Sequence, residues 1–193
     1  MGILLKEENL TNKIYLMLNQ AISTFVDIYG GKTKEFLEEL KKEDFPLTSK
    51  WKYPNDWHVT SLFVGGNKSL LNDPICVNFE ENELISVDFE GLIFVPNKII
   101  CCICFPKTAI KNKIPHVTIM TNGWKAKESN TVSEALFIDG PFKKEYETVF
   151  KNNEYKDKFI ECVNLKILKE NVDIYLIKFP NLIHFDGFNR YFQ

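Results

Sequence analysis

The sequence predicts an α+β fold in which two antiparallel sheets form two lobes around a central cleft, with helices outside. Three observations predict it: an amphipathic pattern near the start, a strand hairpin in the middle, and a tripeptide that occurs twice. With 193 residues, of which 45% are hydrophobic, the chain is long enough for one domain built from two similar lobes. We expect a single bilobal domain over residues 1–193.

Two helices are expected within residues 1–45. Apolar residues recur with helical spacing over about residues 11–29, and Gly30 and Gly31 end this pattern. A shorter, charged helix is expected over about residues 33–42. Neither pattern contains a group of chemically reactive side chains, so we assign both helices to packing.

Strand patterns dominate the rest of the chain. Residues 84–95 and 99–105 are rich in apolar and β-branched side chains, and a short polar turn separates them. This spacing predicts an antiparallel hairpin, with a bulge near Gly91. The other expected elements are a short strand over residues 75–79, a helix over residues 131–137, and a hairpin of residues 163–168 and 172–179. His184 lies beyond them in an aromatic tail, where the sequence assigns it no role.

The repeated tripeptide is His-Val-Thr, and it uses two of the three histidines in the chain. Side chains alternate between the faces of a strand, so His58 and Thr60 share one face, as do His116 and Thr118. Two such surfaces facing each other would bring two imidazoles and two hydroxyls into one cleft, which we interpret as an active site. The alternative is two ordinary strands whose histidines are half-buried and hydrogen-bonded.

These residue types suit the hydrolysis of a phosphodiester. Near neutral pH histidine exists in both acid and base forms, so one imidazole can activate water while the other protonates the leaving oxygen. Threonine hydroxyls can donate hydrogen bonds to the phosphate oxygens. The sequence has no closely spaced set of metal ligands, so we expect neither a metal nor another cofactor.

The two motifs resemble the two-histidine (LigT-like) phosphoesterase superfamily, whose signature is a duplicated His-x-Thr/Ser lining a cleft between two lobes. Together with residues 125–130, they look closest to the cyclic phosphodiesterase domain of fungal and plant tRNA ligases. The resemblance covers about residues 51–136, the region that carries both motifs.

The resemblance implies a role for each motif residue. His58 and His116 would be the catalytic pair, and Thr60 and Thr118 would bind the phosphate. It also implies that His116 activates water and that His58 protonates the leaving oxygen, although the residues themselves do not decide this order.

The function that follows is metal-independent hydrolysis of a 2′,3′-cyclic phosphate, on RNA ends or nucleotides, to a 2′-phosphate, as in RNA repair and tRNA splicing. Two alternatives stay open: a phosphodiesterase for 2′,5′-linked or cyclic signalling nucleotides, and a non-catalytic module that binds RNA ends or nucleotides. The expected partner is an RNA 3′ end or a small cyclic nucleotide. The resemblance is compatible with an RNA ligase or kinase acting with this chain, although the sequence itself does not show one.

Further substrate-binding candidates lie beside the two motifs. Lys125, Lys127 and Ser129 follow the second motif and are candidates for contact with the substrate. Tyr53 and Trp124 lie in predicted loops and are candidates for stacking on a base.

Composition limits the other functions. A net charge of −2 argues against a broad basic face for long duplexes but permits binding of a single RNA end. Five cysteines, an odd number, point to reduced thiols. No apolar run reaches the length of a membrane span. We expect a monomer in the cytoplasm or nucleus.

Overall fold

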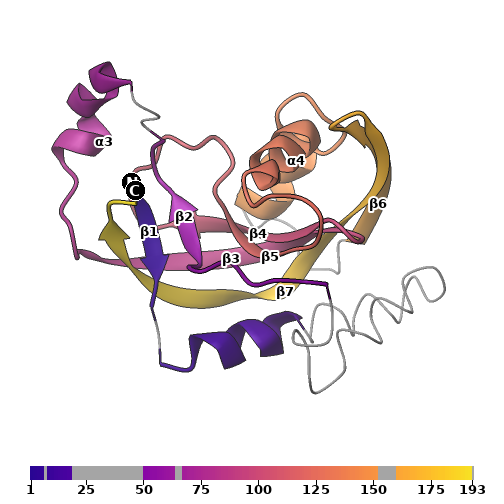
Figure 1. Ribbon diagram of the computed structural model, residues 1–193, viewed down its shortest axis with the longest axis horizontal. Coiled ribbons are helices and arrows are strands. Elements are labelled where there is room, and N and C mark those ends of the chain that lie inside the picture. Colours follow the sequence, from indigo (N-terminus) through magenta and orange to yellow (C-terminus); the bar gives the residue numbers. More distant parts are fainter. Residues whose placement is uncertain (7, 19–49, 64–66, 152–159, 193) are drawn as a thin grey trace.

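The computed structural model describes residues 1–6, 8–18, 50–63, 67–151 and 160–192. Within these residues, a single antiparallel sheet organises the chain (Figure 1). Its strands are β1 (Gly2–Leu5), β2 (His58–Thr60), β3 (Leu84–Val95), β4 (Ile99–Pro106), β5 (His116–Thr121), β6 (Ile160–Ile167) and β7 (Glu170–Arg190). Their order in space is β1-β2-β5-β4-β3-β7-β6.

The sheet closes on itself, because β1 pairs with β7 as well as with β2. Six strands therefore form a closed antiparallel barrel, and β6 extends the sheet beside the first half of β7. The fold is mostly β, with few helices in the described residues.

The expected fold of two facing sheets is therefore wrong. The two His-Val-Thr strands, β2 and β5, are neighbours in the same sheet rather than members of two opposed lobes. The physical reason lies in β7, which runs for 21 residues. Its second half includes the aromatic tail and pairs with both β3 and β1, and these pairings close the sheet.

The central hairpin of β3 and β4 and the bulge near Gly91 are confirmed. The register shifts between Phe89 and Gly91 against both neighbouring strands. On β7 the partners of these two residues are Ile183 and Lys178, so β7 has extra residues at this point. Such irregularities bend a strand and increase its twist, which favours closure of the sheet.

The described helices are short. They are η1 (Lys68–Asn72, 3-10), α3 (Pro74–Val77), α4 (Glu128–Phe137), α5 (Lys143–Glu145) and the π-helical η2 (Tyr146–Lys151), and residues 10–18 are also helical. The helix expected over residues 131–137 is confirmed as the larger part of α4. The first expected helix is confirmed up to residue 18, and the second lies outside the described residues.

The strand expected over residues 75–79 is wrong, because this segment begins as α3. Asp73 caps that helix by accepting a hydrogen bond from the Ile75 N–H, and Pro74 occupies its first position. Both residues are start signals for a helix. The terminal hairpin is confirmed as β6 and β7, which turn at Leu168 and Lys169, both with positive φ.

Alternation along the strands divides the core between the two faces of the sheet. The inner face buries Val59, Phe89 and Val117, and the helix of residues 10–18 packs on it. The outer face buries Cys101 and Ile103 beneath α4 and η2. The side chains next to Val59 and Val117 on β2 and β5 therefore point to the outer face, where α4 lies.

No helix among the described residues is both long and apolar enough to cross a membrane.

Substitution of Gly91 by alanine should destabilise the barrel. A Cβ at this position would lie 2.5 Å from the Ile177 carbonyl oxygen and 2.7 Å from Cε1 of Phe150. Overpacking of this kind costs about 1–3 kcal/mol in the free energy of unfolding, which urea denaturation measures. Lys166→Ala, at an exposed position on β6, is the control and should change little. Equal stabilities for Gly91→Ala and Lys166→Ala would contradict this reading of the bulge.

Candidate active site

Strand register brings the two motifs together. β2 and β5 pair antiparallel with Val59 opposite Val117, the central residues of the two tripeptides. Residues opposite each other in a sheet share a face, so all four polar motif side chains lie on the outer face. The cross-strand pairs are His58 with Thr118 and Thr60 with His116. The two histidines are thus diagonal neighbours, at which separation Cα atoms lie about 7–8 Å apart.

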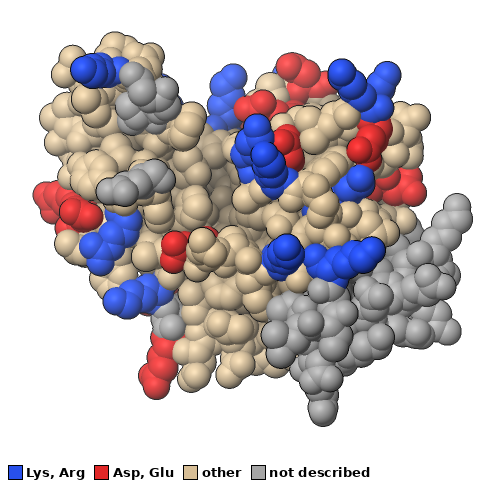
Figure 2. Space-filling model, in the orientation of Figure 1, with Lys and Arg blue, Asp and Glu red and all other residues tan. Residues whose placement is uncertain are grey.

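A cavity of about 490 Å³ opens over these four side chains, and all of them line it. It is also lined by residues that follow β2 and by the start of α4. Figure 2 shows the surface hollowed between the part that carries α3 and the part that carries α4, with Lys or Arg side chains beside the hollow. The volume lies within the range of about 300–1,000 Å³ that small-molecule sites occupy.

His116 is held at both ring nitrogens. Its side chain is almost fully buried, with 6% exposure. Nδ1 lies 2.7 Å from the Ile114 carbonyl oxygen, which can only accept, so Nδ1 carries a proton and donates it. Nε2 lies 2.8 Å from the hydroxyl of Ser129. In the neutral ring Nε2 therefore carries the lone pair.

Ser129 links His116 to Thr118. Its hydroxyl lies 2.7 Å from the Ala126 carbonyl oxygen and 3.0 Å from the Thr118 hydroxyl, which donates to it. Ser129 has one proton, so it can donate to Nε2 of neutral His116 or to Ala126, but not to both. When His116 is doubly protonated, Nε2–H donates to Ser129 and Ser129 donates to Ala126. With a neutral ring, Ser129 can donate to Nε2 while Thr118 donates to the Ala126 carbonyl oxygen at 3.3 Å, so the network can be satisfied in either protonation state.

His58 is half-buried and lies in a different environment. Its ring packs against Phe192, with centroids 4.4 Å apart and planes inclined by 32°. Among the described residues its buried Nδ1 has no hydrogen-bond partner of good geometry. The Asp56 backbone nevertheless lies close enough to the ring to raise the pKa of His58. His58 is thus oriented by an aromatic contact, whereas His116 is oriented by hydrogen bonds.

Burial lowers the pKa of both histidines below the ordinary value of 6.5. For His58, the backbone and carboxylate of Asp56 oppose this shift and raise the pKa. For His116, the hydrogen bond to Ile114 raises the pKa, while a positive charge on His58 lowers it further. Protonation of either histidine therefore disfavours protonation of the other, so the two imidazoles take up their protons in separate steps.

The other predicted substrate-binding residues lie in different places. Ser129 and Lys127 line the cavity, and the Lys127 side chain is 74% exposed. Lys125 is exposed but does not line it. Trp124 is buried in the outer core, and Tyr53 packs edge-on against Trp57, with ring centroids 5.2 Å apart. Neither of these two candidate stacking residues reaches the cavity.

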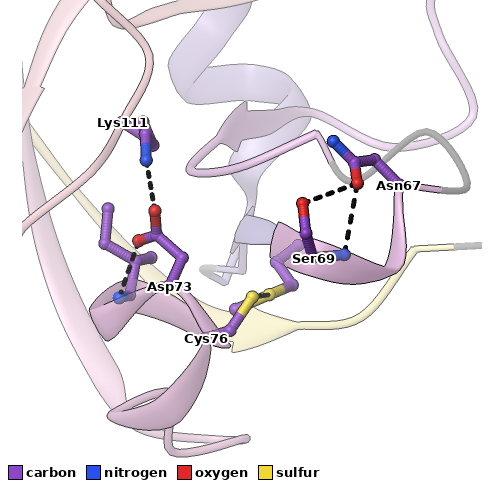
Figure 3. Close-up of polar contacts among 7 residues, drawn as sticks. Asn67, Ser69, Asp73, Cys76 and Lys111 are labelled. Carbon is purple, nitrogen blue, oxygen red and sulfur yellow. Dashed lines mark hydrogen bonds and ion pairs between the residues drawn. The ribbon is translucent and has the colours of Figure 1, made fainter. Parts of the chain in front are cut away.

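Sequence reasoning did not single out several residues that line the cavity, among them Asp56, Phe63, Lys111 and Asn112. The position of Asp56, just before the first motif, was the available signal. Lys111 lies far along the chain from β2, and only the folded sheet brings the two together. Figure 3 shows the Lys111 ammonium directed at the Asp73 carboxylate, whose other oxygen caps α3. This ion pair ties the cavity wall to α3.

His184, the third histidine, lies on β7 and does not line the cavity. Its Nδ1 is hydrogen-bonded to the carboxylate of buried Asp88, which also forms an ion pair with Lys107. Although burial opposes the shift, hydrogen bonds from Lys107 and His184 hold the pKa of Asp88 below its ordinary value. We assign His184 to the surface of the fold rather than to the site.

Among the described residues no group of three or more His, Cys, Asp or Glu side chains is arranged to hold a metal ion. The five cysteines are unpaired, and the three on β4 are buried. Burial raises the pKa of Cys101 to about 12, so this thiol stays protonated near neutral pH.

Ser129→Ala should lower the pKa of His116. The substitution removes both the acceptor of Nε2–H in the protonated ring and the donor to Nε2 in the neutral ring. The hydrogen bond from the charged ring is the stronger of the two, so its loss lowers the pKa, while the burial of the ring stays in place. Imidazole ¹⁵N chemical shifts followed through a pH titration measure this pKa and the tautomer, and the chain has only three histidines to assign. Ser133→Ala, one turn along α4 and equally buried, is the matched control and should leave His116 unchanged. An unchanged or raised pKa in Ser129→Ala would refute the proposed network.

The sequence matches no family model and no curated protein. Thirteen chains among the solved structures match this chain in structure. One is described as the crystal structure of a fungal RNA kinase, with a TM-score of 0.52 at 14% sequence identity. The alignment covers 97% of this chain and 44% of that chain, so the present chain spans less than half the length of the kinase structure. At this identity the similarity establishes a shared fold.

Proposed function

We propose that this protein is a phosphodiesterase that hydrolyses a 2′,3′-cyclic phosphate, at an RNA 3′ end or on a nucleotide, to a 2′-phosphate. The observation that carries the proposal is the register of β2 and β5, with Val59 opposite Val117. Two unrelated strands with buried histidines have no reason to be neighbours in this register. The pairing places the histidine and the threonine of both motifs on the same face of the sheet, where all four side chains line one cavity.

The chemistry needs one basic and one acidic imidazole. Water attacks phosphorus and loses a proton to the base, while the bond between phosphorus and the ribose 3′ oxygen breaks. The acid donates a proton to that oxygen, and the 2′-phosphate remains. The diagonal placement of the histidines leaves space between them for the phosphate, so that the attacking water and the departing oxygen lie on opposite sides.

His116 suits the role of base, and His58 that of acid. The hydrogen bond from Nδ1 of His116 to Ile114 leaves Nε2 as the basic nitrogen, and burial lowers the pKa of this histidine. The Asp56 carboxylate favours the charged form of His58. When water replaces Ser129 at Nε2, Ser129 retains its hydrogen bond to Ala126.

The threonines suit the phosphate oxygens. Thr60 and Thr118 both line the cavity, and each is only partly buried, so their hydroxyls can reach a ligand. Thr118 donates to Ser129 in the free protein and would exchange this bond for one to a non-bridging oxygen. Such donors stabilise the charge that develops on the phosphate during attack.

The shared fold supports an RNA substrate, since one of its members is described as a fungal RNA kinase. We therefore propose a place in RNA repair, in association with an RNA kinase or ligase. We also propose that no metal takes part, because two imidazoles suffice as acid and base.

Replacement of either histidine by alanine should lower kcat/KM for 2′,3′-cyclic nucleotides by about 10²–10⁴-fold, the usual contribution of a general acid or base. Thr60→Ala and Thr118→Ala should each lower it on the order of 10²-fold, because each removes a donor to the phosphate. His184→Ala is the matched control and should retain activity. The assay uses a panel of cyclic-ended RNA, 2′,3′-cyclic, 2′,5′-linked and cyclic signalling nucleotides, with a chelator present.

The panel separates the candidate functions. Turnover only of 2′,5′-linked or signalling nucleotides would replace the proposed substrate, and binding without turnover would indicate a non-catalytic module. Activity that is abolished by the chelator and restored by a divalent ion would refute metal independence.

The order of the roles can be tested with an activated aryl phosphodiester, whose leaving group needs no proton. On this substrate His58→Ala should recover much of its rate, because the acid is no longer required, while His116→Ala should stay slow. With the wild type, the acidic limb of kcat/KM should reflect the protonation of His116, because the protonated ring cannot act as base. Recovery by His116→Ala instead would reverse the two roles.

A further inference from the structure

The cavity contains more space and more residue types than a phosphate alone requires. Beyond the four motif residues, its lining includes an aromatic residue, Phe63, and two asparagines, Asn112 and Asn130. Phe63 lies three residues after β2, close in the chain to both Thr60 and His58. A phosphate held by the four motif side chains, as in the proposed function, would leave the remaining volume to the groups attached to it.

Phe63 is 81% exposed and belongs to neither hydrophobic cluster of the described residues. The residue before it, Leu62, is buried, so the side chain of Leu62 points into the protein while that of Phe63 points to solvent. A large aromatic ring exposed beside a cavity is available to a ligand, whereas one in a core is not.

The backbone leading to Phe63 is held in place. The N–H groups of Ser61 and Leu62 both donate to the Met1 carbonyl oxygen, at 3.1 and 3.3 Å. The Ser61 carbonyl accepts from the N–H of Lys111 at 2.8 Å, and the Lys111 side chain is paired with Asp73 on α3. The ring is thus carried by an anchored segment beside the cavity, which lowers the cost of ordering it on binding.

The two amides leave groups free to bond to a ligand. Oδ1 of Asn112 accepts from the Ile114 N–H at 3.2 Å, and its amide nitrogen can still donate. The amide nitrogen of Asn130 donates to the Lys127 carbonyl at 3.4 Å, and its Oδ1 can still accept. A donor and an acceptor beside an aromatic ring suit a flat, polar heterocycle better than an aliphatic chain.

We propose that Phe63 is the stacking surface for the base of a nucleoside phosphate or of the last nucleotide of an RNA chain. The proposal rests on the proposed function for the position of the phosphate, which the motif residues would hold at the cavity floor. Stacking tolerates any base, because each has a π-face, so this subsite selects a nucleotide without selecting its sequence. The base-stacking role expected of Tyr53 and Trp124 falls to Phe63, because neither of those rings lines the cavity.

The test compares two ligands that differ only in the base: adenosine 2′-phosphate and 1-O-methylribose 2-phosphate. Phe63→Ala should weaken adenosine 2′-phosphate binding by about 5- to 150-fold, the range of measured base-stacking contributions, and leave the base-free ligand unaffected. Phe63→Trp should retain affinity for the nucleotide. Leu71→Ala, at another exposed apolar side chain that does not line the cavity, is the control and should change neither. Calorimetric titration measures the dissociation constants.

A second measurement uses the 2-aminopurine nucleotide, whose fluorescence is quenched when the base stacks. Wild type should quench it, and Phe63→Ala should quench it less. The proposal would be overturned if Phe63→Ala weakened the binding of both ligands equally or of neither. It would also be overturned if the wild type did not bind the nucleotide.

The outcomes separate this inference from the proposed function. Base-dependent binding through Phe63 without turnover of any cyclic phosphate would retain the stacking site and refute the hydrolase. Suppose instead that turnover depends on both histidines, but Phe63→Ala changes the affinity for the two ligands equally, with and without the base. This result would retain the hydrolase and refute the stacking site.

Discussion

The pairing of Val59 with Val117 is the constraint on which the site depends. Both valines are fully buried in the inner core, so a slip of either strand by one residue would expose a valine and turn a histidine inward. The hydrophobic effect therefore determines the register, and the register determines where the imidazoles and hydroxyls lie. The polar side chains of the site lie on the opposite face of the same two strands. They are placed by the apolar residues between them.

The helix α4 adds the second constraint, because it covers one histidine and leaves the other more accessible. Its first turn brings Ser129 against Nε2 of His116 and removes that ring from water, which lowers its pKa. His58 instead packs against Phe192 and lies near the Asp56 carboxylate. Two identical tripeptides thus place their imidazoles in different surroundings, which is how one site can obtain an acid and a base from the same residue type.

Local patterns predicted the strands and hairpins well but the closure of the sheet poorly. The bulge at Gly91 was recognisable, because glycine within an apolar strand pattern signals such an irregularity. The pairing of β1 with β7 was not recognisable, because it joins residues from the two ends of the chain that share no sequence signal. Tyr53 and Trp124 show the same limit at the site. Their proximity to the motifs in sequence did not indicate that both rings pack against other side chains.

The sequence alone determined which residues alternate to one face of each motif strand, since a strand has a period of two whatever its neighbours are. It therefore sufficed to identify His58, Thr60, His116 and Thr118 as a set. Tertiary structure alone decided that the strands are adjacent in one closed sheet, that Lys111 and Phe63 reach the same cavity, and that Ser129 contacts His116. These contacts join segments that are far apart along the chain, and sequence separation does not predict distance in space. The packing of the whole barrel determines which of these segments meet.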